Sequence, residues 1–280
     1  MKRDAKAIQA SLVMDRERRI LFVEGIRDRN FLIMLVREAR DHAAEVIIAE
    51  RLDIEAEGGA RGKVLAMVGQ LLQHDARMLG FVDADYARFL DHSCPARILW
   101  TDYRDLEGYL LSQRHLAAAL GVGLAIENQG EAALLLDSCE DSLRDISAVR
   151  ISALRGNWGV SISNLDMSRY VEVDRRTWKV VLKTRKLITA GIQNAGLSGK
   201  LVDAWLESVS KERCALNRCD DYRQVFHGKD FISVATKWLE SRSRRNASAF
   251  EAAFWSTATG GLEPHPNLAS VLHFLSAAQA

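Results

Sequence analysis

Short apolar segments alternate with amphipathic ones over the first 110 residues, and this alternation restricts the possible folds more than any other feature of the chain. Four short segments are predicted to be buried strands: Arg19–Val23, Glu45–Glu50, Met78–Val82 and Arg97–Trp100. Between them, Asp28–Arg40 and Val64–His74 carry apolar residues at helical spacing and are predicted to be amphipathic helices. This order predicts an α/β fold with a mainly parallel sheet flanked by helices.

The pattern changes after residue 110, where helical periodicity dominates. Helices are predicted at Leu110–Leu120, Gly130–Asp137, Ser198–Ser208, Phe231–Ser241 and Ala247–Trp255. Tyr170–Val173 is the one strand-like stretch that interrupts them. We therefore expect two domains, an α/β domain over residues 1–110 and a mostly helical domain over residues 111–280. The second domain is expected to serve dimerisation or the binding of a partner or nucleic acid.

Composition excludes two classes of protein. The formal net charge of +1 argues against a strongly basic protein that binds nucleic acid through its overall electrostatic field. Any polyanion would therefore have to bind to local basic patches or to a metal. No apolar run approaches the roughly 18 residues of a membrane span, and residues 1–15 are charged. The four cysteines are scattered along the sequence, which is typical of reduced thiols. The expected location is the cytoplasm, with no membrane partner.

Acidic residues follow directly after the predicted strands. Glu24 comes after the first strand, and Asp83 and Asp85 come after the third. In open α/β sheets, ligands bind beyond the carboxyl ends of the strands. Asp83 and Asp85 point to the same side if the extended geometry continues past the strand, because side chains alternate with period two. Oxygen ligands suit Mg²⁺ or Mn²⁺, so these three carboxylates predict a metal site for phosphoryl chemistry.

These motifs resemble the TOPRIM domain, which is shared by topoisomerases, bacterial primases and overcoming-lysogenization-defect nucleases. The resemblance is carried by Val23-Glu24-Gly25-x-x-Asp28 and by Phe81-Val82-Asp83-Ala84-Asp85. The chain is still more similar to the TOPRIM-like family of unknown function numbered 4435. Further matching motifs are Thr101-Asp102-x-x-Asp105-x-Glu107-x-Tyr109-Leu110 and Gly228-Lys229-Asp230.

The resemblance implies a Mg²⁺- or Mn²⁺-dependent endonuclease with Glu24, Asp83 and Asp85 as catalytic residues. It further implies a nucleic-acid substrate, either RNA such as transfer RNA or DNA, and a homodimer. Some members resemble PARIS-type effectors of bacterial anti-phage defence, which a partner ATPase of the ABC/AAA type controls. The chain has no G-x-x-x-x-G-K-[ST] loop of its own, so such a partner would have to bring the ATP.

Five further residues match family positions or lie near the site. Asp28 is a candidate metal ligand, and Asp105 and Glu107 are candidates for a second metal. Lys63 and Lys229 are candidates for phosphate contacts. Each has a simpler interpretation: a charge at a helix N-terminus for Asp28, capping for Asp105, and a solvated face for Glu107 and the lysines.

Two other interpretations remain open. A basic tract that includes Arg175, Arg176, Lys179 and Lys183 surrounds Trp178, which suits nucleic-acid contacts but is also typical of a solvated face.

The whole chain could be a non-catalytic TOPRIM-like scaffold that binds an ATPase or nucleic acid. The complete set of Glu24, Asp83 and Asp85 favours the enzyme. Strand passage and primer synthesis are disfavoured, because the chain leaves little room for a tyrosine-bearing domain and its cysteine spacing supplies no zinc module.

Overall fold

The computed structural model describes residues 2–36, 44–72, 77–126, 129–243, 247–259 and 265–276. The chain forms two compact units. Unit 1 comprises residues 1–87, 91–102 and 261–280, and unit 2 comprises residues 88–90 and 103–260. The boundary expected at residue 110 therefore falls inside unit 2, and the last twenty residues belong with the first.

Unit 1 is an α/β sandwich around a four-stranded parallel sheet, as the sequence predicted. Its strand order is β2-β1-β3-β4. The strands are β1 (Arg19–Val23), β2 (Ala44–Ile48), β3 (Met78–Val82) and β4 (Ile98–Trp100). The helices are α1 (Ala5–Met14), α2 (Ile26–Val36), α3 (Gly59–Leu71) and α10 (Pro266–Ser276), with a 3-10 turn η1 (Ala49–Arg51) after β2.

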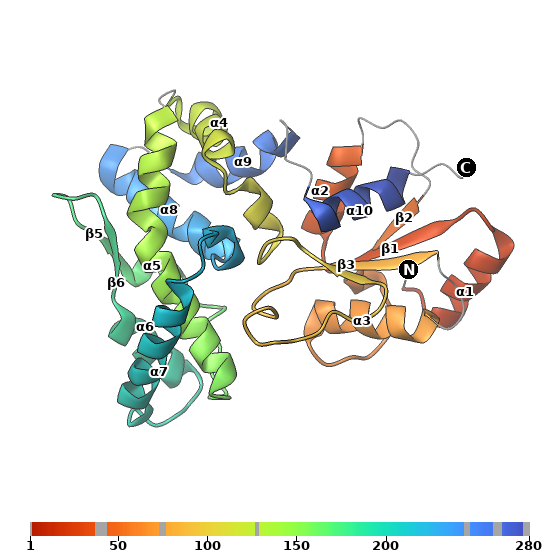
Figure 1. The fold of residues 1–280 in the computed structure, drawn as a ribbon, viewed down its shortest axis with the longest axis horizontal. Coiled ribbons are helices and arrows are strands. Elements are labelled where there is room, and N and C mark those ends of the chain that lie inside the picture. The colour runs from red at the N-terminus through yellow and green to blue at the C-terminus, as the bar shows by residue number, and fades with distance from the viewer. Residues whose placement is uncertain are drawn as a thin grey trace. The chain divides into compact units, whose positions relative to one another are not determined.

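Both faces of this sheet are covered, which explains why its strands are continuous apolar runs. In Figure 1, α3 lies on one face with α1 beside it, and α2 and α10 lie on the other. Ile20 and Phe22 of β1 belong to the buried cluster that includes residues of α1 and α3. Gly80 allows α3 to approach β3 closely, because a Cβ there would lie 3.1 Å from a methyl carbon of Val64.

The predicted elements of unit 1 differ from the observed ones mainly at their ends. β1 and β3 have the predicted bounds. β2 ends at Ile48, two residues before the predicted end at Glu50, and η1 follows it. The helix predicted to begin at Val64 begins at Gly59. Residues 37–40 and 73–74 of the predicted helices lie outside the described residues. The sequence patterns did not predict α1 or α10.

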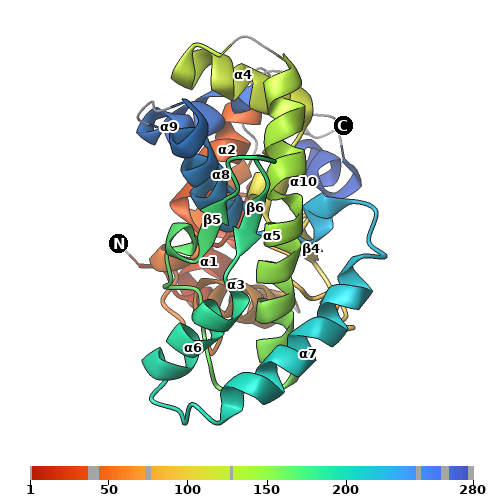
Figure 2. The same cartoon turned by 90° about the vertical axis from the view of Figure 1, so that its left-hand side faces the viewer.

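Unit 2 is mostly helical, as expected, and is built around one long helix, α5. This helix packs against α4, α6, α7, α8 and strand β6, and Figure 2 shows it extending past α6, α7 and the β5–β6 hairpin. The α-helices and strands of the unit are α4 (Gln113–Leu124), α5 (Gln129–Arg155), β5 (Val171–Val173), β6 (Val180–Leu182), α6 (Thr184–Asn194), α7 (Leu201–Leu216), α8 (Gly228–Ser243) and α9 (Ser248–Ser256).

Short 3-10 turns connect these elements: η2 (Leu106–Leu110), η3 (Met167–Arg169), η4 (Tyr222–Gln224) and η5 (Thr257–Thr259). The segment after β4 carries the Thr101-Asp102-x-x-Asp105-x-Glu107 motif. It forms η2, which begins at Leu106, with Asp105 as its N-cap. Fully buried aromatic side chains, among them Trp205, Trp238 and Phe254, form the core of the unit.

Candidate active site

Glu24 and Asp83 lie side by side because they follow neighbouring strands. β1 and β3 pair in parallel with Val23 opposite Phe81, so the residues that follow them meet at one edge of the sheet. The backbone N–H of Asp83 donates a hydrogen bond of 3.0 Å to Oε1 of Glu24. The two residues are 59 positions apart in sequence, and the strand order alone brings them together.

Asp85 belongs to the turn that follows β3. Its φ of 48° lies in the left-handed region, so the extended geometry assumed for Asp83 and Asp85 does not continue through Asp85. Ala84 between them is fully buried, while both aspartates are half-buried. The backbone N–H of Ala84 donates to Oγ1 of Thr101, the residue after β4, at 2.8 Å. This bond anchors the turn to the end of the neighbouring strand.

Asp28 lies in the first turn of α2 and closes the turn after β1. Its Oδ2 accepts a hydrogen bond of 2.7 Å from the backbone N–H of Gly25. This contact matches the simpler interpretation of Asp28 as a residue that stabilises a helix start. Its charge still acts on the site, because it is one of the groups that raise the pKa of Glu24.

The Glu24 carboxyl is held in an environment that disfavours its charge. Burial, followed by the negative charges of Asp85 and Asp28, raises its pKa from 4.5 to about 7. The hydrogen bond from Asp83 and the positive charge of Arg61 act in the opposite direction. Glu24 therefore exchanges its proton near neutral pH, which is a property of groups that act as general acids or bases.

Arg61 is the functional candidate that sequence reasoning missed. Its Nη1 lies 3.2 Å from Oδ2 of Asp85, and its guanidinium carbon lies 5.9 Å from the centre of the Trp100 ring. The sequence held one signal, because Arg61 lies two positions after the pair Gly58-Gly59 and two positions before Lys63. Lys63 was chosen there instead, and it lies half-buried on α3.

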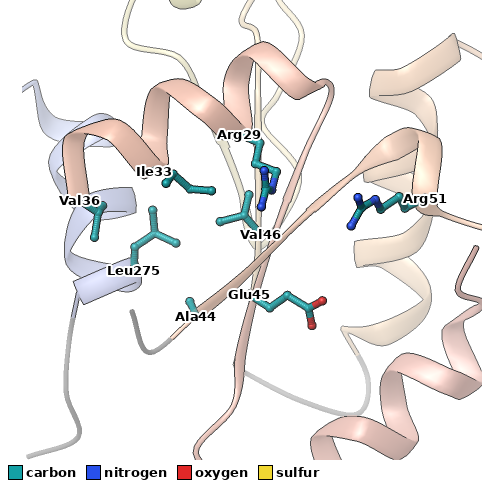
Figure 3. Close-up of a pocket in the computed structure, with 8 residues that line it drawn as sticks. All are labelled: Arg29, Ile33, Val36, Ala44, Glu45, Val46, Arg51 and Leu275. Carbon is teal, nitrogen blue, oxygen red and sulfur yellow. The ribbon is translucent and has the colours of Figure 1, made fainter. Parts of the chain in front are cut away.

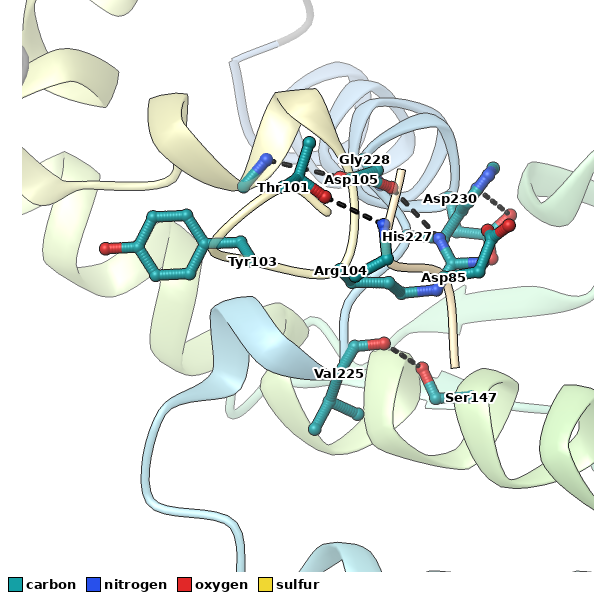
Figure 4. Close-up of polar contacts among 12 residues, drawn as sticks. Asp85, Thr101, Tyr103, Arg104, Asp105, Ser147, Val225, His227, Gly228 and Asp230 are labelled. Atoms are coloured by element: carbon teal, nitrogen blue, oxygen red, sulfur yellow. Dashed lines mark hydrogen bonds and ion pairs between the residues drawn. The ribbon is translucent and has the colours of Figure 1, made fainter. Parts of the chain in front are cut away.

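Asp105 and Glu107 belong to unit 2 and have their own partners there. Oδ2 of Asp105 pairs with Arg104 at 2.9 Å and accepts from the Gly228 N–H at 2.8 Å (Figure 4). Burial and the neighbouring Glu107 raise the pKa of Asp105 to about 6. The backbone N–H of Gly108 also donates to Asp105, which confirms the capping interpretation. The second-metal role of Asp105 and Glu107 stays a prediction.

The late Gly-Lys-Asp motif contacts this same segment. A Cβ at Gly228 would lie only 2.0 Å from Cβ of Glu107, so only glycine fits there. Asp230 is buried and forms a two-point ion pair with Arg150, at 2.8 Å for each bond. Burial opposes its charge, but Arg150 and His227 hold the pKa of Asp230 far below its ordinary range. Lys229 is exposed beside them.

Several cations of the basic tract of unit 2 pair with acidic residues of the same unit. Lys179 pairs with Asp137 at 2.9 Å. Two further ion pairs join Lys183 to Glu172 and Arg185 to Asp203. Such exposed pairs contribute little to stability, but they reduce the positive charge that the tract presents to a polyanion.

A separate hollow lies elsewhere in unit 1, between α2, β2 and α10. Its volume is about 250 Å³, and apolar side chains line it together with Arg29, Glu45 and Arg51 (Figure 3). Arg3 and Arg18 both pair with Glu45. None of the predicted site residues lines this hollow, so it is not part of the carboxylate site.

The donor chemistry of the site fits a hard divalent cation, but the geometry is not a closed metal site. Glu24, Asp83 and Asp85 offer oxygen ligands alone, which are the ligands that Mg²⁺ and Mn²⁺ prefer. Within the described residues, however, no three His, Cys, Asp or Glu side chains converge as metal ligands. A cation would therefore have to draw the carboxylates together and compete with Arg61 for Asp85.

Neither the family models nor the curated proteins compared with the sequence give a match. The resemblance to TOPRIM domains therefore rests on the motifs quoted above. No helix among the described segments is both long enough and apolar enough to cross a membrane.

Proposed function

We propose that the chain is a metal-dependent TOPRIM-like nuclease whose centre is Glu24, Asp83 and Asp85. The observation that carries the proposal is the meeting of Glu24 and Asp83 at adjacent ends of parallel strands, joined by the 3.0 Å hydrogen bond. Asp85 acts electrostatically on the same Glu24 carboxyl. Convergence of acids from separate strand ends is the arrangement that metal-assisted phosphoryl transfer requires.

Each residue has a role that its surroundings support. Asp83 and Asp85 would hold Mg²⁺ or Mn²⁺ through carboxylate oxygens, with Asp85 exchanging its ion pair with Arg61 for that bond. Bound there, the cation would supply Lewis acidity toward the phosphate and lower the pKa of a water. Glu24 would move a proton at the scissile bond, because its pKa of about 7 suits general acid–base catalysis.

A cleavage assay tests this proposal. The purified chain is incubated with total transfer RNA or with plasmid DNA, in Mg²⁺, in Mn²⁺ and in EDTA. We expect cleavage only with metal, and a loss of at least about 100-fold in Glu24→Gln and Asp83→Asn. Asp53→Asn is the matched control, because Asp53 is exposed and lies outside the cluster. Full cleavage by Glu24→Gln would contradict the assignment.

The defence role is a further part of the proposal and rests on the resemblance alone. We propose that the nuclease is a toxic effector that acts as a homodimer under the control of an ABC/AAA-type ATPase, with transfer RNA as one substrate. The test is co-expression with a neighbouring ATPase gene. Toxicity that the ATPase restrains, and that Glu24→Gln abolishes, supports this role. Equal toxicity with and without the ATPase argues against it.

A non-catalytic module is the second candidate, and one observation favours it. Asp85 already has a cationic partner in Arg61, and no ready set of three ligands occurs among the described residues. A scaffold of this kind would bind an ATPase or nucleic acid without a metal. Calorimetric titration with Mg²⁺ and Mn²⁺ separates the two candidates. Only the nuclease requires saturable metal binding, and Asp83→Asn should remove that binding.

A further inference from the structure

A second hollow of unit 1 adjoins the carboxylate cluster. Its volume is about 460 Å³, within the roughly 300–1,000 Å³ range of small-molecule sites. The first turns of α3 contribute Arg61 and Leu65, the loop before β4 contributes His92, Ser93 and Pro95, and the end of β4 contributes Trp100. The walls thus combine apolar surface with a guanidinium, an imidazole and a hydroxyl.

Arg61 connects this hollow to the proposed metal-binding carboxylates. It lines the hollow while its Nη1 lies 3.2 Å from Oδ2 of Asp85. Its guanidinium also lies over the Trp100 ring, at 5.9 Å from the centre. Arginine binds phosphate through a planar set of donors and stacks on aromatic faces, so one side chain here serves both the acidic cluster and the hollow.

Trp100 gives the hollow an aromatic wall. Its side chain is buried, and its indole N–H meets no acceptor among the described residues. Asp91 also lines the hollow and offers a carboxylate that can accept from N–H groups of a base.

We propose that this hollow binds the nucleotide that adjoins the scissile phosphodiester. Arg61 contacts its phosphate, Trp100, Leu65 and Pro95 pack against its base, and Asp91 and His92 reach the polar edge of that base. The inference rests on the proposed function for the identity of the bond that is cut. It goes further by assigning substrate contacts to residues outside the carboxylate cluster.

Asp85 and Arg61 are then coupled through substrate binding. In the structure described here, the guanidinium compensates the charge of Asp85. This contact uses Nη1 of Arg61, and the other N–H donors of the guanidinium can meet the phosphate of a bound nucleotide while the pair with Asp85 persists. Arg61 is therefore a substrate-binding residue that does not depend on a bound cation.

Binding of mononucleotides in EDTA tests this inference without any cleavage. The probes are AMP, GMP, CMP and UMP, with inorganic phosphate as comparison, each titrated into the full chain by calorimetry. We expect at least one nucleotide to bind more tightly than phosphate. Affinity should fall at least tenfold in Arg61→Ala and less in Arg61→Lys, which keeps the charge and loses the planar donors. Arg51→Ala, in the separate 250 Å³ hollow, should bind like the wild type.

The outcomes for this site and for the nuclease are distinguishable. Unchanged binding by Arg61→Ala, equal binding of phosphate and nucleotide, or no nucleotide binding by the wild type would each overturn the inference. None of these results bears on whether the wild type cleaves nucleic acid with Mg²⁺. Conversely, nucleotide binding that depends on Arg61, in a chain that never cleaves, supports the hollow and refutes the nuclease.

Discussion

Glu24 is the residue whose chemistry depends most on its neighbours. An isolated glutamate has an ordinary pKa of 4.5, whereas burial and two nearby aspartates raise the pKa of Glu24 to about 7. A carboxyl group that binds its proton more tightly in the folded state stabilises the fold at low pH. That contribution is complete below pH 4.5 and is lost as the pH rises through about 7.

Glu24→Gln should therefore remove a pH dependence of stability. The amide oxygen of glutamine still accepts the bond from Asp83, while the buried charge is gone. In EDTA at pH 8, we expect the free energy of unfolding to exceed that of the wild type by about 1–3 kcal/mol. At pH 4.5 the two should differ little. Urea denaturation across this pH range makes the comparison, with Asp53→Asn as control. If the free energies of unfolding of the wild type and Glu24→Gln changed in parallel with pH, Glu24 would have an ordinary pKa.

At the scale of elements, the starts of two helices depend on residues far away in sequence. Asp102 follows β4, and its carboxylate accepts from the backbone N–H groups of Asn267 and Leu268, both at 2.9 Å. It thus satisfies N–H donors in the first turn of α10, about 165 residues later, and not those of a helix that begins at Asp102 itself. In unit 2, the first residue of α8, Gly228, packs directly on Glu107 of η2.

Asp102→Ala should destabilise α10 by about 1 kcal/mol, since it removes a side-chain cap. Asp102→Asn should lose less, because its amide oxygen still accepts. Thermal unfolding measures the effect, and amide hydrogen exchange of α10 locates it. If exchange accelerates uniformly through unit 1 and not first at α10, the capping role is contradicted.

Gly228→Ala should destabilise unit 2 by about 1–3 kcal/mol or more, because the added Cβ would overlap Glu107 and displace the N–H that binds Asp105. Gly199→Ala is the matched control, since a Cβ there meets nothing within 4 Å. Chemical denaturation of both variants checks the difference. Equal stability of the two would mean that α8 and η2 separate at little cost.

At the scale of the whole molecule, unit 1 is completed by the end of the described chain. α10 contacts α2, β2 and β4, and it buries Leu268, Val271 and Leu275. Arg19 of β1 also donates to the carbonyl of Phe274 at 3.1 Å. The sheet is therefore covered on this face by segments that are more than 200 residues apart in sequence.

Deletion of the chain from residue 265 onward should destabilise unit 1 by several kcal/mol. Three buried apolar side chains are lost, each contributing roughly 1.5–3 kcal/mol. Hydrogen exchange should increase in β1, β2 and α2, while the helices of unit 2 keep their protection. Loss of protection confined to unit 2 would contradict the assignment of α10 to unit 1.

The α/β class, the bounds of β1 and β3, and the position of Glu24 and Asp83 at strand ends were all predictable from the sequence. Local patterns sufficed for these, because burial on both faces requires continuous apolar runs and parallel strands end at a common edge. The ion pair of Arg61 with Asp85, the capping of α10 by Asp102 and the burial of Asp105 against Gly228 depend on contacts between distant segments. These contacts could be seen only in the tertiary structure, because local periodicity does not indicate which side chains of a distant segment will lie nearby.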